Sequence, residues 1–469
     1  MDELLEYSLF EIAEKIRSGE VTSESVTKRC LDQIEKTKDR NIFISVYEES
    51  IEVAKACDAM RKAGHILGPL HGVPIAVKDN IYMKGHVTTA GSKIMKNFIP
   101  EYDATVLARL KSAGAVIIGK TNMHEFAWGG TTENPHYGYC KNAWDFERNP
   151  AGSSGGSGSA VGLRCCYGAL GTDTGGSVRL PSAVNGISGI RPTIGRISNY
   201  GVVPLAYSED TVGPMCRTVK DCALMFQVLA GHDTKDRTTA LKPVENYMAD
   251  LQKGLRGIRI GVIKDYCLYH NQPDVLRLYK QALEQMRMLG AEICEVELTD
   301  LDGLIDAQLI IDAVEPSTLH LKYLRECSED YGRDVRTLLE AGCLFRATHY
   351  IQALQYRTLL IEKINGVLEE VDAIATPTLP FTALKIGEQK IEIESGQIED
   401  NLSANMRYTA IPSITGKPAL SVPCGFDDNG LPVGIQLIGN SFEEKRLFRI
   451  GNAYQESVSF HRQSPILKS

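Results

Sequence analysis

No run of about 18 apolar residues, the length that a membrane-spanning helix needs, occurs in the chain. The sequence also lacks a basic tract. Its 51 Lys and Arg residues are outnumbered by 59 Asp and Glu residues, so the formal net charge is −8 at pH 7. An acidic chain without clustered Lys or Arg is a poor partner for nucleic acid or an anionic membrane. We therefore expect neither a nucleic acid nor a membrane as partner.

Closely spaced cysteines are also missing. The 12 cysteines form no Cys-x-x-Cys motif, and only Cys165 and Cys166 are adjacent. In a chain of 469 residues this predicts reduced, mostly buried thiols rather than a secreted disulfide framework. The first residues, Met1–Glu6, are acidic and lack the apolar segment of a signal peptide. Both patterns predict a cytoplasmic protein.

Known metal and phosphate motifs do not appear either. Neither a Gly-x4-Gly-Lys-Ser/Thr pattern nor a Gly-x-Gly-x-x-Gly pattern stands after a predicted strand. The acidic and histidine side chains nearest the glycine-rich motifs are too dispersed in the sequence for a ligand set; they are Asp79, His124, Glu125 and Asp173. We therefore predict no metal and no cofactor.

What the chain does contain is an alternation of helical and strand patterns, which indicates an α/β layered fold. Helices are predicted over 8–18, from Thr22, over 48–63, 103–111, 157–165 and 273–289, across 303–368 and over 442–457. Strands are predicted over 73–77, 115–119, 167–170, 258–263 and 291–297 and near residues 373, 419 and 433. We expect one domain over 1–469, made of a helical segment (1–66), a motif-bearing core (67–230) and a remainder (231–469).

The most informative stretch lies between Pro150 and Pro181, where two Ser/Gly-rich segments flank an apolar run. Glycine lets backbone amides approach a ligand because no Cβ is in the way. The consecutive amides of Thr174, Gly175, Gly176 and Ser177 can form a concave nest that favours an anion. An oxyanion hole has the same requirement.

Other interpretations of these segments are weaker. A flexible linker is disfavoured because both segments adjoin apolar runs and the composition does not shift around them. Residues 152–156 match Gly-x-Ser-x-Gly and would make Ser154 the nucleophile of a nucleophile elbow. That motif needs a strand directly before it, and residues 146–150 are polar and end in proline. We therefore discount Ser154 as nucleophile.

Taken together, these residues resemble the amidase signature family of serine amidohydrolases. The resemblance runs from Gly72–Asp79 through both Ser/Gly segments to Pro423–Phe426 and covers nearly the whole chain. It implies a single large mixed sheet with helices on both faces. It also implies a catalytic trio in which Ser177 is the nucleophile, Ser153 a bridging serine preceded by a cis peptide bond, and Lys78 the base. The two serines stand 24 residues apart, as in the family.

Lysine can be a base only in its neutral form, and its pKa in water is about 10.4. Burial can lower that value by roughly 3–5 units, and Lys78 follows an apolar run, residues 74–77, that is suited to burying it. A Ser-His-Asp triad is the natural rival, since the chain has 10 histidines. Neither His71 nor His124, both in the motif-bearing half, lies in a triad-like signature. A catalytically inactive binding protein is disfavoured because all three trio positions are occupied.

The family contains free-standing amidases and the A subunit of the aminoacyl-tRNA amidotransferase, which hydrolyses glutamine for a partner. That enzyme component tends to carry Asp where this chain has His124, Gln where it has Leu180, and an acidic residue where it has residues 406–409. These departures favour a free-standing amidase that acts on a small-molecule amide. The amidotransferase component is the alternative. A homodimer is possible.

The natural substrate is not evident from the sequence. By resemblance, the acyl pocket would be lined by Met123, Phe126, Trp128, Gly129 and Tyr408. The acidic segment 386–400 lacks clear periodicity, and we expect it to be a surface excursion that lies either apart from the substrate or at the mouth of its pocket.

Overall fold

The computed structural model describes residues 3–394 and 396–465. Three of the predicted segments therefore include residues outside the described ones. These are residues 1–2 of segment 1–66, residues 466–469 of segment 231–469, and residue 395 of segment 386–400. Within the described part of the chain, no helix is long and apolar enough to cross a membrane.

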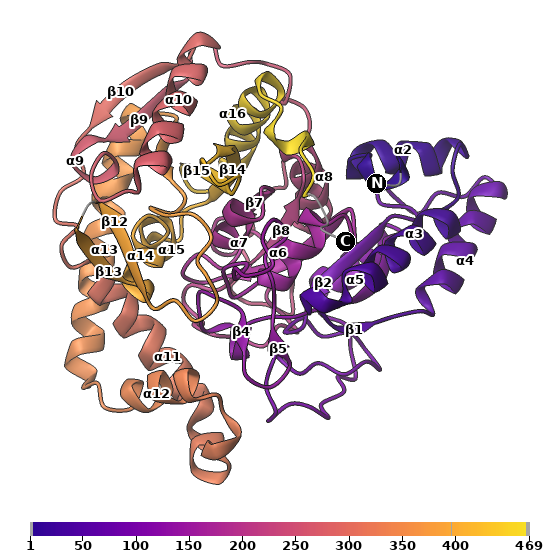
Figure 1. Ribbon diagram of the computed structural model, residues 1–469, viewed down its shortest axis with the longest axis horizontal. Helices are drawn as coiled ribbons and strands as arrows, with labels where there is room; N and C mark the ends of the chain where they lie inside the picture. The colour runs from indigo at the N-terminus through magenta and orange to yellow at the C-terminus, as the bar shows by residue number, and fades with distance from the viewer. Residues whose placement is uncertain (1–2, 395, 466–469) are drawn as a thin grey trace.

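A single mixed sheet of 11 strands runs through the molecule (Figure 1). In spatial order its strands are β1 (Phe43–Val46), β3 (Val116–Thr121), β2 (Pro74–Lys78), β6 (Gly168–Asp173), β8 (Thr211–Cys216), β7 (Ser188–Arg191), β14 (Ala419–Phe426), β15 (Pro432–Ile438), β11 (Ala373–Pro377), β9 (Arg259–Ile263) and β10 (Glu292–Val296). Parallel pairs join β3 to β2 and β2 to β6 near one edge, and β11 to β9 and β9 to β10 at the other. The pairs between them are antiparallel.

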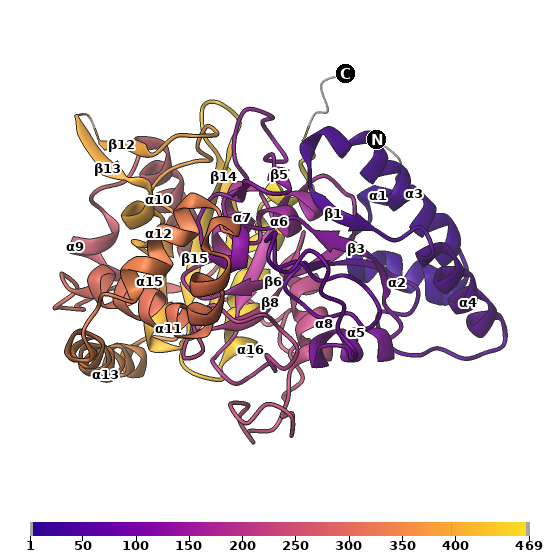
Figure 2. The same ribbon diagram turned by 90° about the horizontal axis from the view of Figure 1, so that it is seen from below.

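Helices cover both faces of this sheet, as strand β14 shows. Leu420 and Val422 point toward Gly451 of α16 (Glu444–Ser457). Ser421 pairs with Gly189 of β7. A Cβ built on Gly189 would point at the hydroxyl of Ser182 in α7 (Arg179–Val184). Successive side chains of a strand point to opposite faces, so α16 and α7 lie on opposite sides (Figure 2). The predicted α/β fold, a single large mixed sheet with helices on both faces, is confirmed.

The helical lead-in matches its prediction closely. The α2 helix (Leu9–Ser18) begins with a capping box in which the side chains of Ser8 and Glu11 each accept from the other residue's main chain. Thr22 caps α3 (Ser23–Lys36), and α4 (Ser50–Lys62) follows. The other helices are α1 (Glu3–Glu6), α5 (Thr105–Ser112), α6 (Gly155–Gly162), α8 (Val219–Leu229), α9 (Lys264–Cys267), α10 (Pro273–Met288), α11 (Leu304–Glu326), α12 (Arg333–Gly342), α13 (Ala347–Glu370), α14 (Asn401–Met406) and α15 (Ala410–Thr415).

Segment 386–400, expected as a surface excursion without clear periodicity, contains regular secondary structure. Strands β12 (Lys390–Glu394) and β13 (Gln397–Asp400) pair there as a separate antiparallel hairpin. The alternation of Ile391 and Ile393 with charged residues gives the hairpin one apolar face, and both isoleucines are buried against Leu180 and Ala151. The short strands β4 (Glu133–Asn134) and β5 (Gly138–Tyr139) form a second small sheet.

Close packing of the central strands depends on glycine at Gly213 of β8. A Cβ at this position would lie 2.1 Å from the carbonyl oxygen of Ile190, a backbone atom of the neighbouring strand region. In contrast, Gly366 in α13 has no such neighbour within 4 Å. The two glycines therefore differ in whether a methyl group fits.

We predict that Gly213→Ala lowers the free energy of unfolding by about 1–3 kcal/mol, because the backbone at Ile190 must move. The matched control, Gly366→Ala, should raise it by about 0.5–1 kcal/mol, because alanine loses less backbone entropy in a helix. Urea unfolding followed by circular dichroism measures both. Equal effects of the two substitutions would contradict the packing described here.

Candidate active site

Lys78 is the last residue of β2, and its side chain is fully buried. The Nζ atom donates to the hydroxyl of Ser153 at 2.7 Å and to that of Thr172 at 2.8 Å. Burial lowers the pKa of Lys78 to about 7, although the carboxylates of Asp173 and Asp210 act in the opposite direction. A lysine with this pKa is substantially neutral at physiological pH and can accept a proton.

Ser153 follows a cis peptide bond, Gly152–Ser153. The loop after β3 lies directly against it: the amide of His124 donates to the carbonyl of Ser153 at 3.1 Å. A Cβ on Gly152 would lie 2.6 Å from the carbonyl oxygen of Gly129. Glycine at 152 therefore lets this loop and the first Ser/Gly segment approach each other.

Ser154 is fully buried at the start of α6. Its hydroxyl donates to the main-chain oxygen of Thr172 at 3.2 Å and lies 3.3 Å from the Thr172 amide as acceptor. No named strand of the described residues ends directly before residue 154, as a nucleophile elbow would require. Ser154 therefore joins the first Ser/Gly segment to β6.

The second Ser/Gly segment forms an open turn between β6 and α7. Gly176 has φ +138°, a value that side-chain-bearing residues rarely adopt. The amide N–H groups of residues 174–177 donate to no acceptor within 3–394 and 396–465. Gly175 and Ser177 are partly exposed while their neighbours are buried. The Ser177 hydroxyl likewise has no hydrogen bond to the described residues, so only the Lys78–Ser153 link of the predicted relay is formed.

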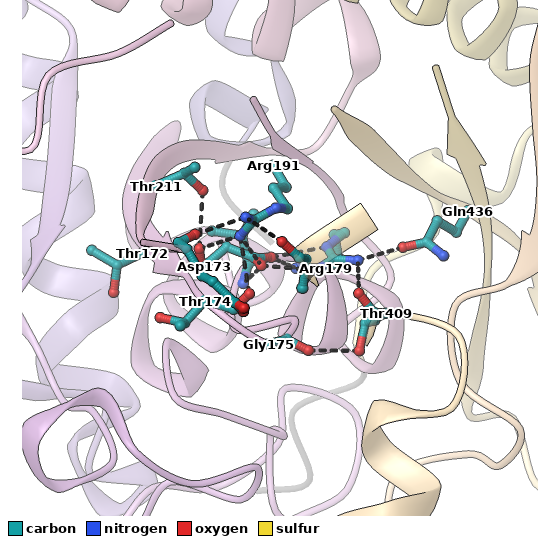
Figure 3. A network of polar contacts seen from close by, with 12 residues as sticks. Thr172, Asp173, Thr174, Gly175, Arg179, Arg191, Thr211, Thr409 and Gln436 are labelled. Carbon is teal, nitrogen blue, oxygen red and sulfur yellow. Dashed lines mark hydrogen bonds and ion pairs between the residues drawn. The ribbon is translucent and has the colours of Figure 1, made fainter. Parts of the chain in front are cut away.

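A buried ionic network holds this turn in place (Figure 3). The Asp173 carboxylate accepts from the Val178 amide at 3.0 Å, from the Arg179 guanidinium at 2.8 and 3.0 Å, and from Arg191 at 3.2 Å. Burial by itself would raise the pKa of Asp173, but Arg179 and Arg191 hold it well below its usual range. Arg179 also donates to Gln436 at 2.7 Å.

Three further polar residues at the site are not predicted by the sequence analysis. Thr172 receives Lys78; Asp210 accepts from the Thr174 hydroxyl at 2.6 Å; and Thr409 donates to the carbonyl of Gly175 at 2.6 Å. Thr172 lies next to the predicted nest and could have been inferred from it. Asp210 and Thr409 are distant in sequence, and no local pattern places them at the turn.

The residues expected to line the acyl pocket are dispersed. Met123, Phe126 and Trp128 are buried in a cluster with residues of α12, and the Phe126 ring packs against His320 at 4.4 Å. Tyr408 is buried and donates to Asn271 at 2.9 Å. The Gly129 carbonyl oxygen lies against Gly152, the residue before Ser153.

A cavity of about 380 Å³ opens beside the turn. Thr172, Thr174 and Asp210 contribute to its wall, together with Ala127 and the apolar residues Val202–Leu205. None of the five predicted pocket residues lines it. Among the described residues, no group of three or more His, Cys, Asp or Glu side chains could hold a metal ion.

Known proteins resemble this chain over nearly its whole length. The family model described as Amidase matches residues 25–448. The A subunit of the glutamyl-tRNA(Gln) amidotransferase from Myxococcus xanthus is 38% identical over 98% of this chain and 99% of that protein. A solved structure described as an amidase superposes with a TM-score of 0.89 at 33% identity, covering 97% of this chain and 100% of the other.

A second solved structure has a TM-score of 0.92 at 32% identity and covers 96% of this chain and 98% of the other. It is described as part of a vestigial protein complex that reveals the evolutionary origins of an s-triazine catabolic enzyme. The family match, the full-length relatives and the shared fold show that this chain belongs to the amidase family.

Proposed function

We propose that this amidase hydrolyses a linear amide through an acyl-enzyme on Ser177. The observation that carries the proposal is the buried 2.7 Å hydrogen bond from Lys78 to Ser153 beside a turn whose amides are free. Neutral Lys78 accepts the hydroxyl proton of Ser153 while Ser153 accepts that of Ser177, and the Ser177 oxygen bonds the amide carbonyl carbon.

The same relay then returns the proton to the amide nitrogen. The carbon–nitrogen bond breaks, ammonia or an amine leaves, and an ester remains on Ser177. Water, activated by Lys78 through Ser153, hydrolyses that ester to the free acid. The free amides of Thr174, Gly175, Gly176 and Ser177 supply the oxyanion hole, where donors aimed at developing charge need no reorganisation during the reaction. No step calls for a metal or a cofactor.

Asp173, Arg179 and Arg191 act as positioning residues in this scheme. Their buried hydrogen bonds fix the end of β6, the turn and the start of α7 relative to one another. The turn is thus kept with its amides outward, which the oxyanion hole requires.

A second candidate function is that of the amidotransferase A subunit. The sequence analysis favours a free-standing amidase, but the curated relatives, which carry the amidotransferase name, support the alternative better. In the structure Arg407, one of the departures from the amidotransferase pattern, forms an ion pair with Glu399, and His124 binds Asp334 at 2.8 Å. Both assignments share the amide hydrolysis described above.

Substitution of Ser177 tests the nucleophile. We expect Ser177→Ala to abolish amide hydrolysis without loss of the folded state, and a fluorophosphonate probe to label Ser177 in the parent protein. Ser154→Ala is the matched control, because its hydroxyl binds only the Thr172 main chain. The probe should still label Ser177 in the Ser154→Ala variant. Labelling at Ser154 would instead support the nucleophile elbow.

The pH dependence of acylation tests the base. Neutral Lys78 is the active form, so the acylation rate should be low below pH 7, rise through about 7 and level off above it. Lys78→Arg should lower the rate about 10²–10⁴-fold, because a guanidinium stays protonated. Exposed Lys84→Arg is the control. A Lys78→Arg rate within a few-fold of the parent would show that another group transfers the proton.

Assays of the purified chain by itself distinguish the two candidate functions. A free-standing amidase should release ammonia or an amine from at least one member of a panel of primary amides, anilides and glutamine. The amidotransferase component should remain inactive on that panel until its partner proteins and charged tRNA are added, and should then use glutamine. Ammonia release measured with and without partners decides between them.

A further inference from the structure

A second set of buried acidic groups lies next to the nucleophile turn and takes no part in the mechanism above. Glu209 comes from the segment between β7 and β8, whereas Gln308 and Asp312 stand four residues apart on one face of α11. All three side chains are at least nine-tenths buried. The Gln308 amide nitrogen donates both to the Glu209 carboxylate and, at 3.0 Å, to the Asp312 carboxylate.

One oxygen on each of these three side chains remains without a hydrogen-bond donor among the described residues. These atoms are Glu209 Oε1, Gln308 Oε1 and Asp312 Oδ1. Buried acceptors normally find a donor, because an unsatisfied polar group costs roughly 1–3 kcal/mol. Three unpaired acceptors on neighbouring side chains indicate a missing group with several donors.

The two arginines that act on the pKa of Glu209 make their hydrogen bonds to other groups. Arg191 donates to the main-chain oxygen of Glu209 at 2.7 Å and to Asp173, and Arg357 donates to Ser208 at 2.9 and 3.0 Å. No ion pair to the Glu209 or Asp312 carboxylate occurs in residues 3–394 and 396–465. Two buried carboxylates without a counter-ion are unstable as a pair of anions.

This acidic set borders the site where the acyl group would bind. A Cβ built on Gly175 would lie 3.5 Å from Asp312 Oδ2 and would meet no other atom within 4 Å, apart from neighbours in the chain. Gly175 is partly exposed, so the buried Asp312 carboxylate lies directly behind an accessible part of the turn. A substrate held by the amides of residues 174–177 therefore passes close to the Asp312 carboxylate.

We propose that Glu209, Gln308 and Asp312 bind a primary ammonium group of the amide substrate. The inference rests on the amide hydrolysis proposed above and narrows the substrate to aminoalkyl amides, that is, amides with an amino group on a short carbon chain. An alkylammonium group has three N–H donors and one positive charge. It would supply both the hydrogen bonds and the counter-ion that this set lacks.

Protonation keeps the set stable when no cation is present. Burial raises the pKa of Glu209 to about 7, despite opposing effects of Arg357 and Gln308. Burial together with Glu209 raises the pKa of Asp312 well above its usual range. The groups facing them from adjacent segments are Asp210, Glu315, Arg191 and Arg357. A bound ammonium favours the ionised carboxylates, so binding near pH 7 should release protons.

Calorimetric titration with n-butylammonium chloride tests the site without relying on hydrolysis. At pH 7 the protein should bind n-butylammonium at least ten-fold more tightly than n-butanol, and titrations in two buffers should reveal proton release. Asp312→Asn and Glu209→Gln should each weaken the binding at least ten-fold. Exposed Asp306 on the same helix is the control, and Asp306→Asn should leave the binding unchanged.

Hydrolysis of matched amides tests the role of the site in substrate choice. 4-Aminobutanamide and pentanamide differ by an ammonium in place of a methyl group, as do 5-aminopentanamide and hexanamide. For the better pair, kcat/KM should favour the ammonium member at least ten-fold. Asp312→Asn should lower that ratio at least ten-fold, and Asp306→Asn should preserve it. Circular dichroism checks folding, and Glu209→Gln replaces Asp312→Asn if the latter does not fold.

The outcomes separate the two proposals. Equal binding of n-butylammonium and n-butanol, or equal kcat/KM within both amide pairs, would overturn the ammonium site and leave amide hydrolysis intact. Binding of ammonium or potassium ions as tight as that of n-butylammonium would also overturn it, since the site would then hold a small cation. Binding that depends on Asp312, with no amide hydrolysed and no labelling of Ser177, would overturn the proposed hydrolysis and support the ammonium site.

Discussion

The carboxylate of Asp173 and the guanidinium groups of Arg179 and Arg191 are buried together, and removal of Asp173 would leave two buried guanidinium charges without this carboxylate. Their hydrogen bonds connect four parts of the chain: the end of β6, the turn 174–177, the start of α7 and the end of β7. Arg179 also reaches Thr409 and Ser413 next to and within α15. The position of the Ser177 turn therefore depends on this ion triplet.

The triplet also affects Lys78. Asp173 raises the pKa of Lys78, and an uncompensated Asp173 carboxylate would favour the protonated amine. Desolvation of Lys78 outweighs this attraction, so its pKa falls to about 7. The two arginines pair with the same carboxylate. In the proposed mechanism the ion triplet shapes the oxyanion hole, whereas burial keeps the base neutral.

Carboxylates on two sides of the turn have different environments. Asp173 is fully paired with arginines, whereas Glu209 and Asp312 share only an amide donor from Gln308. The first arrangement is complete and suits a structural role. The second has three oxygens without a donor and lacks a counter-ion, and it is there that we place the substrate's ammonium group. The presence or absence of counter-ions therefore distinguishes Asp173, which supports the turn, from Glu209 and Asp312, which we propose bind the ligand.

Local patterns in the sequence predicted most elements, and the motifs that carry the family resemblance implied the residues of the proposed catalytic trio. The capping box at Ser8, the apolar strand before Lys78 and the paired Ser/Gly segments are short-range features, and such features survive without tertiary information. The hairpin of β12 and β13 was missed, although the alternation of Ile391 and Ile393 signals it. Strands β1, β7 and β8 were also not predicted from the sequence.

Only the tertiary structure placed Thr409, Asp210 and Asp312 around the Ser177 turn, because each comes from a segment more than 30 residues away in the chain. It also placed Met123, Phe126 and Trp128, which the resemblance assigns to the acyl pocket, in a buried cluster with residues of α12, a segment distant in sequence. The chemistry of a residue type can be inferred from sequence. The degree of desolvation and the set of counter-ions, which decide whether Lys78 is neutral and Asp312 unpaired, arise only when distant segments pack together.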